Sequence, residues 1–207
     1  MVLLGVCAGM LTAGAPAAQA RKHKVVTCSV KGGTTVAHHG GQRLITKDGP
    51  DDSLYGPATK IYACRQAHRP AVLLDETEEG TSISISGVRF TRWYVVYAAS
   101  GSSSECTKYQ PDAPECFFSY VASYDLRTGK LRAITKGDAA SPVLSTKGWF
   151  AWVTAPDPLG SRSVIGVDGG GSHTLDQGGI NAASLGFSGA RLGWKRTDGT
   201  AQSATLG

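Results

Sequence analysis

The stretch WYVVYAA, residues 93–99, decides the fold class because aromatic and β-branched residues dominate it, as they do in β-strands. Glycine-containing turn sequences at 127–130, 168–171 and 197–199 separate runs of the same kind. Asp-Gly and Gly-Gly supply the positive φ angles that tight hairpins need. No convincing helix of about ten residues follows residue 20, so the chain is predicted to be all-β. The further runs are CFFSYVASYDL (116–126), WFAWVTA (149–155), RSVIGVD (162–168) and ARLGWKR (190–196).

The strand-like runs repeat along the chain. From Trp149 to Arg191 the interval is 42 residues, whereas from Trp93 to Trp149 it is 56. The excess of 14 residues falls within 101–116, which we interpret as an insertion between the second and third strands of one unit. A period near 42 residues with four strands per unit is typical of propeller blades.

The repeat predicts β-propeller-like units, about four blades of four antiparallel strands each. The blades are expected over about 34–75, 83–138, 139–180 and 181–207. The last blade stops after three strands, and a strand from Lys24 to Val30 would complete it and close the ring. An open partial propeller and a β-sandwich remain alternatives.

Two longer stretches resemble the third and fourth strands of blades in secreted bacterial propellers of the WD-repeat-like and Tol-associated kinds. They are YVASYDLRTGKLRAIT (120–135) and VIGVDGGGSHTLDQGG (164–179). In both, a strand ends in Asp, a glycine turn follows, and the next strand contains Leu. No repeat carries the Trp-Asp dipeptide. The resemblance implies the fold and a binding or scaffolding surface rather than a particular chemistry.

The first 20 residues have the pattern of a signal peptide. They carry no charge, and the apolar segment from Val2 to Leu11 leads to the small residues Ala18-Gln19-Ala20. We therefore expect cleavage after Ala20 and a secreted or periplasmic protein with a single domain over 21–207. No later stretch is apolar enough for an integral membrane segment.

Four cysteines follow the predicted cleavage site, and an even number in an exported chain favours disulfides. Three pairings are open. Cys106 with Cys116 closes the shortest loop, and Cys28 with Cys64 then follows by elimination. That second pair conflicts with ring closure, because a closing strand in the last blade would hold Cys28 away from Cys64 in the first.

No set of residues predicts catalysis, a cofactor or a metal. Ser172-His173-Thr174-Leu175-Asp176 contains the residue types of a hydrolase triad, but neighbouring strand residues face opposite ways. For the same reason, one of His38 and His39 is expected to pack and the other to be solvated. The oxygen-rich segment Asp48 to Ser53 would suit calcium but lacks the EF-hand frame.

The aromatic residues suggest where binding occurs. The four tryptophans recur at matching repeat positions and are expected to pack between blades. Tyr109 lies in the cysteine loop, outside the repeat, and with Lys108 and Gln110 it forms the predicted binding trio.

The predicted function is an exported, non-catalytic binding or scaffold module whose partner is a cell-envelope polymer or a protein. The net charge of +5 is scattered over the sequence rather than clustered among aromatics, so nucleic-acid binding is not expected. The alternative is an envelope hydrolase or lyase whose residues come from several blade loops.

Overall fold

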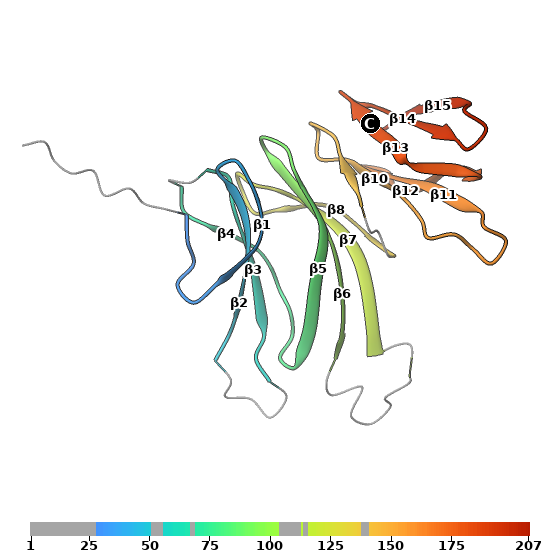
Figure 1. Cartoon of the computed structure of the whole chain (residues 1–207). Helices are drawn as coiled ribbons and strands as arrows, with labels where there is room; N and C mark the ends of the chain where they lie inside the picture. The colour runs from blue at the N-terminus through green and yellow to red at the C-terminus, as the bar shows by residue number, and fades with distance from the viewer. Residues whose placement is uncertain (1–27, 51–55, 67–68, 104–112, 114–115, 138–140) are drawn as a thin grey trace, which may run out of the picture.

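The computed structural model describes residues 28–50, 56–66, 69–103, 113, 116–137 and 141–207. In these ranges the chain forms fifteen β-strands in four antiparallel sheets, each built from strands that are consecutive in sequence. Figure 1 shows the sheets following one another from the blue N-terminal part to the red C-terminal part. The prediction of an all-β fold is confirmed.

The four sheets follow the order of the predicted repeat units. Sheet A contains β1 (Thr34–His39), β2 (Gln42–Asp48), β3 (Thr59–Cys64) and β4 (Val72–Glu76). Sheet B contains β5 (Thr81–Phe90), β6 (Tyr94–Ser103), β7 (Phe117–Asp125) and β8 (Leu131–Lys136). Sheet C contains β9 (Val143–Leu144), β10 (Phe150–Val153), β11 (Arg162–Asp168) and β12 (Gly171–Gly178). Sheet D contains β13 (Ile180–Ser188), β14 (Arg191–Arg196) and β15 (Ala201–Thr205).

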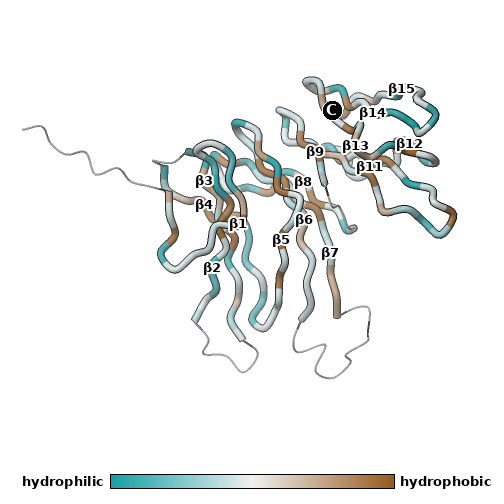
Figure 2. Tube along the Cα trace, viewed as in Figure 1, coloured by the Kyte–Doolittle hydropathy of each residue, from teal (hydrophilic) through white to brown (hydrophobic). Residues whose placement is uncertain are grey.

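Sheet B packs on both faces, which explains why the first six residues of β6, Tyr94 to Ala99, are all aromatic or apolar. Successive strand residues point to opposite faces. Val95 and Tyr97 belong to the core shared with sheet A, whereas Val96 and Ala98 belong to the core shared with sheet C. Figure 2 shows apolar colour in the middle of this stack. A run of buried residues in β6 thus joins three sheets.

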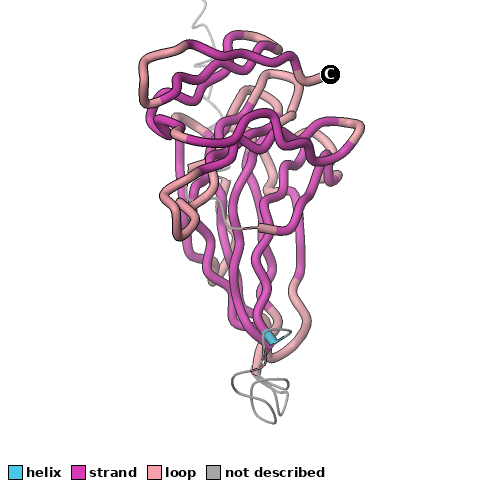
Figure 3. Tube along the Cα trace, turned by 90° about the vertical axis from the view of Figure 1, so that its right-hand side faces the viewer, coloured by secondary structure: helices cyan, strands magenta, loops and turns pink. Residues whose placement is uncertain are grey.

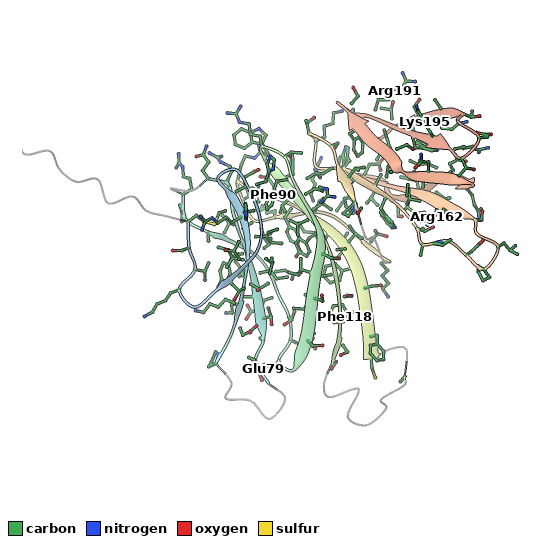
Figure 4. The ribbon with its side chains drawn as sticks, viewed as in Figure 1. Glu79, Phe90, Phe118, Arg162, Arg191 and Lys195 are labelled. Carbon is green, nitrogen blue, oxygen red and sulfur yellow. A yellow bond between two sulfur atoms is a disulfide. The ribbon has the colours of Figure 1, made fainter. Side chains whose placement is uncertain are left out.

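Sheet D packs on sheet C through one face only. Leu192 and Trp194 of β14 lie in a core with Ala151 and Val164 of sheet C. The other face of β14 carries exposed charges, and Figure 4 shows Arg191 and Lys195 on this outermost sheet.

The expected closing strand does not extend sheet D where the structure describes it. Cys28 is disulfide-bonded to Cys64 of β3, with the two Cα atoms 6.1 Å apart. Val30 packs with Ile45 of sheet A and this disulfide. The predicted pairing of Cys28 with Cys64 is therefore confirmed, and residues 28–30 lie against sheet A because the disulfide holds them there. In Figure 1 sheets A and D lie at opposite ends of the molecule.

Cys116 also forms a disulfide. Its expected partner, Cys106, lies outside the described residues, as do the predicted signal peptide and the cleavage site after Ala20. The pairing of Cys106 with Cys116, the signal peptide and the cleavage site therefore stay predictions. In the part of the chain that the structure describes, no helix is long and apolar enough to cross a membrane.

Three of the four tryptophans pack between sheets as expected. Trp149, Trp152 and Trp194 are buried, each with at most 6% of its surface exposed. Trp93 is the exception, because it is only half-buried and lies in the turn before β6. The prediction that Trp93 packs between sheets like the other tryptophans is therefore wrong.

The strands of sheet B extend beyond their neighbours. β5 and β6 each have 10 residues and β7 has 9, whereas β9 and β10 of sheet C have 2 and 4. Figure 3 shows these long strands running down to the grey loops. We call this end of sheet B, formed by Thr81, Ser103 and Phe117, the loop end. The opposite end, where β5 joins β6 and β7 joins β8, is the turn end.

Candidate binding surface at the loop end of sheet B

A regular array of serine hydroxyls covers one face of sheet B at the loop end. In the strand register, Ser84 of β5 lies opposite Ser100 of β6, which lies opposite Ser119 of β7. One row further, Ser82 lies opposite Ser102. Residues two apart share a face of a strand, so these five hydroxyls form a serine array on one surface.

The serine array is continuous with an exposed aromatic ring. Phe117 lies opposite Ser102 in the next strand, in the same row as Ser82, and 54% of its surface is exposed. Ser82 and Ser84 are exposed as well. The hydroxyls of Ser82 and Ser102 lie 3.1 Å apart. The array faces the same way as Val96 and Val121 but lies beyond the reach of the short strands of sheet C.

A second aromatic ring, Phe118, lies on the opposite face of β7 and is held in place by its neighbours. It stacks on Tyr120 with ring centroids 6.0 Å apart. Gly101 makes room for it, because a Cβ atom at this position would lie 2.7 Å from the ring of Phe118 and would overlap the carbonyl oxygen of Ser82. The close approach of β6 and the Phe118 ring therefore requires glycine.

The aromatic stack continues into the core between sheets A and B. Tyr97 is fully buried and stacks on Tyr124 with centroids 5.7 Å apart. The hydroxyls of Tyr120 and Tyr124 both donate to the same carboxylate oxygen of Asp75, each at 3.0 Å. Phe118 is thus fixed by a tyrosine cluster that a carboxylate of β4 ties to sheet A.

Burial keeps the tyrosines of this cluster protonated. It raises the pKa of Tyr97, Tyr120 and Tyr124 above that of a free tyrosine, and the carboxylate of Asp75 adds to the rise. The hydroxyls therefore remain hydrogen-bond donors at physiological pH. The cluster positions Phe118 rather than supplying a base or a nucleophile.

Cavities surround the two phenylalanines at the loop end. One of about 580 Å³ is lined by the serine array, Phe117 and Phe118. Another of about 560 Å³ lies between β7 and the end of β8 and is lined by both phenylalanines, Ile134 and Lys136. A third of about 330 Å³ contains Phe118 and the acidic end of β4. Among the residues that the structure describes, the first of these cavities has no charged residue in its lining.

The predicted binding trio belongs to the segment between β6 and β7. Lys108, Tyr109 and Gln110 lie outside the described residues. The segment that contains them connects Ser103 to Phe117, so it joins the two strands that carry the serine array and the phenylalanines.

The other candidate residues are not brought together. His173 lies 3.1 Å from Asp168, whereas Asp176 accepts a hydrogen bond from Trp194 and pairs with Arg196, so Ser172, His173 and Asp176 form no triad. His38 and His39 are both exposed, and the expectation that one of them packs is wrong because β1 is largely exposed. Asp48 accepts a hydrogen bond from Thr59, and residues 51–55 lie outside the described part.

The serine array was missed by sequence reasoning although a signal was present. Residues 81–86 read TSISIS, in which serine alternates with isoleucine. Ile83 and Ile85 pack on the core with sheet A, so the serines between them must face the other way.

Comparison with known proteins supplies no assignment. No protein-family model matches this sequence, and neither does any curated protein.

Proposed function

We propose that the protein is an exported, non-catalytic binding module built from propeller-like repeats, and that its loop end binds a neutral polysaccharide. The observation that carries the proposal is the uncharged serine array with the exposed ring of Phe117 at its edge. The disulfide between Cys28 and Cys64 supports an oxidising compartment.

The chemistry of the serine array suits a polyol. Each serine hydroxyl both donates and accepts hydrogen bonds, as each sugar hydroxyl does. An exposed aromatic ring such as Phe117 offers a flat apolar face on which the C–H face of a sugar ring can pack. Because the described lining carries no charged side chain, a neutral ligand can bind there without removing an ionic group from water.

The rigidity of the surface supports binding as well. The hydroxyls lie on paired strands, and the tyrosine cluster fixes Phe118 beside them. A surface that is already ordered loses little conformational entropy when it binds. The predicted loop residues Lys108, Tyr109 and Gln110 would add contacts from the segment that joins β6 to β7.

The test is retention of the protein on an array of neutral and acidic glycans, with Phe117→Ala as the first variant. Phe117 is half-exposed, so its truncation should change thermal stability little while retention on the neutral glycans falls at least about tenfold. Leu159→Ala is the matched control, because Leu159 is 93% exposed and lies between β10 and β11 of sheet C.

The double variant Ser84→Val and Ser100→Val removes two facing hydroxyls and introduces valine, which favours strands. We expect weaker retention of this variant too. Equal retention of wild type, Phe117→Ala and the double variant would refute the proposal. Release of new sugar ends from a retained glycan would instead identify the hydrolase or lyase of the alternative hypothesis.

A further inference from the structure

A cluster of arginine side chains surrounds Trp93 at the turn end of sheet B. The guanidinium carbons of Arg65, Arg92 and Arg127 lie 4.6, 4.7 and 5.4 Å from the centre of the indole ring. They come from three separate connections, which follow β3, precede β6 and follow β7. Figure 4 marks Phe90 at this end and Phe118 at the other.

Backbone contacts hold two of these connections against each other and one of them against sheet A. The amide of Leu126 donates to the carbonyl oxygen of Trp93 at 2.8 Å. Gly129, with a φ of 71°, lets the turn after β7 approach sheet A, because a Cβ atom there would lie 2.6 Å from the carbonyl oxygen of Leu73. The positions of the arginine-bearing turns are therefore set by the fold.

The positive charges of this cluster exceed the negative ones. Arg127 pairs with Asp125, whose pKa is held below its usual range by that guanidinium. Within the described ranges, no carboxylate lies within salt-bridge distance of Arg65 or Arg92. Arg132 adds a further cation nearby, with its guanidinium carbon 3.9 Å from the centre of the Trp149 ring.

A cavity of about 310 Å³ opens beside these side chains. It is lined by Arg65, Arg69 and Arg127 together with the apolar residues Pro70, Val72 and Leu126. Guanidinium groups present paired N–H donors that match the oxygens of carboxylate, sulfate and phosphate groups. A cavity with three arginines in its wall therefore has the chemistry to hold an oxyanion.

The described contacts compensate the positive charge of this cluster only in part. Cation–π contacts with Trp93 compensate each guanidinium only weakly at an exposed site, and the like charges repel one another. A bound oxyanion would attract each guanidinium group and offset the repulsion between them. Its oxygens would also accept hydrogen bonds from guanidinium N–H groups, which an indole ring face cannot do.

We propose that Arg65, Arg69 and Arg127, in the wall of the cavity beside Trp93, form a binding site for an oxyanion group, namely a carboxylate, a sulfate or a phosphate. This site goes beyond the polysaccharide surface and does not depend on it, because the two lie at opposite ends of β6 and β7.

The test is isothermal titration of the whole protein at low ionic strength with sodium sulfate, sodium phosphate and sodium glucuronate. Saturable binding of at least one of these salts is expected, and comparison of the three distinguishes tetrahedral oxyanions from a carboxylate. In the double variant Arg65→Gln and Arg69→Gln the affinity should fall at least about tenfold.

The matched control is Arg191→Gln and Lys195→Gln, which removes two cations from the outer face of sheet D. The affinity of this variant should equal that of the wild type, and thermal unfolding of both variants should be cooperative. The proposal fails if none of the three salts binds saturably. It also fails if the two double variants lose affinity equally, because that would indicate attraction by net charge alone.

Discussion

The loop end and the turn end of sheet B are formed by the same strands, β6 and β7, yet they carry opposite chemistry. The loop end presents uncharged hydroxyls and phenylalanine rings, whereas the turn end gathers arginines around an indole. The difference lies in how each surface is assembled. Alternation along strands produces the serine array, while the arginine cluster requires three turns to meet.

The two ends also differ in the contacts that stabilise them. The loop end is joined to the core by the tyrosine cluster and Asp75. The turn end depends on sheet A, because Arg65 directly follows Cys64 of the disulfide. Perturbing one end should therefore leave the chemistry of the other largely intact.

The largest effect should come from removing the disulfide in the double variant Cys28→Ala and Cys64→Ala. The disulfide closes a loop with a sequence separation of 36 residues, so its loss should lower the free energy of unfolding by about 4 kcal/mol. Chemical denaturation measures this change. In the folded variant, sulfate affinity should fall because Arg65 loses its anchor, while glycan retention persists. Unchanged sulfate affinity would show that β3 alone positions Arg65.

The loop between the strands provides the next test. Residues 107–115 are replaced by a Gly/Ser linker of equal length, with Cys106 and Cys116 retained. If Lys108, Tyr109 and Gln110 contribute contacts, retention on the neutral glycans should fall at least about tenfold, equivalent to about 1.4 kcal/mol. The thermal midpoint and the sulfate affinity should change little. A folded variant with full retention would restrict the binding surface to the serine array and the phenylalanines.

Arg196 sharpens the comparison, because it has a carboxylate partner that Arg65 and Arg92 lack. Its hydrogen bonds lower the pKa of Asp176 to about 2, below the usual value of 3.8. A carboxyl with a lowered pKa in the folded state stabilises the fold above its unfolded pKa and loses that contribution as the pH falls. We therefore expect stability to decline between about pH 4 and pH 2, by about 1 kcal/mol after solvent screening.

The variant Asp176→Asn should lack this part of the pH dependence. Thermal unfolding of wild type and variant between pH 5 and pH 2 measures the difference. Parallel stability curves would mean that the pair of Asp176 and Arg196 adds nothing to folding.

The two ends also differ in how far the sequence predicts them. Strand runs and the 42-residue repeat predict the sheets, because packing on both faces requires continuous apolar segments such as residues 93–99. The alternation in residues 81–86 contains enough information to predict a hydroxyl surface. Periodicity is a local property of the chain, and local properties can be read without a structure.

The turn end could not be predicted in this way. Arg65, Arg92 and Arg127 are far apart in the sequence, and each lies in a turn where an exposed charge is ordinary. Trp93 occupies the same repeat position as the buried Trp149, so the repeat predicted a core residue. Only the approach of three connections shows that the charges converge.

The smallest effect concerns the one carboxylate within the arginine cluster. Asp125 pairs with Arg127 and also accepts a hydrogen bond from the backbone amide of Arg127 at 2.8 Å. Asn at this position keeps an oxygen for the amide but removes the negative charge. Sulfate affinity of Asp125→Asn should therefore rise about threefold at low ionic strength and less at high salt. Glycan retention at the loop end should not change.

Asp157→Asn is the matched control for this variant, because Asp157 likewise accepts backbone hydrogen bonds, from Leu159 and Ser161, in a connection of sheet C. Its sulfate affinity should equal that of the wild type. Weaker rather than tighter sulfate binding by Asp125→Asn would show that Asp125 serves to orient Arg127. Sulfate would then be bound mainly by Arg65 and Arg69, with Arg127 held by its own carboxylate.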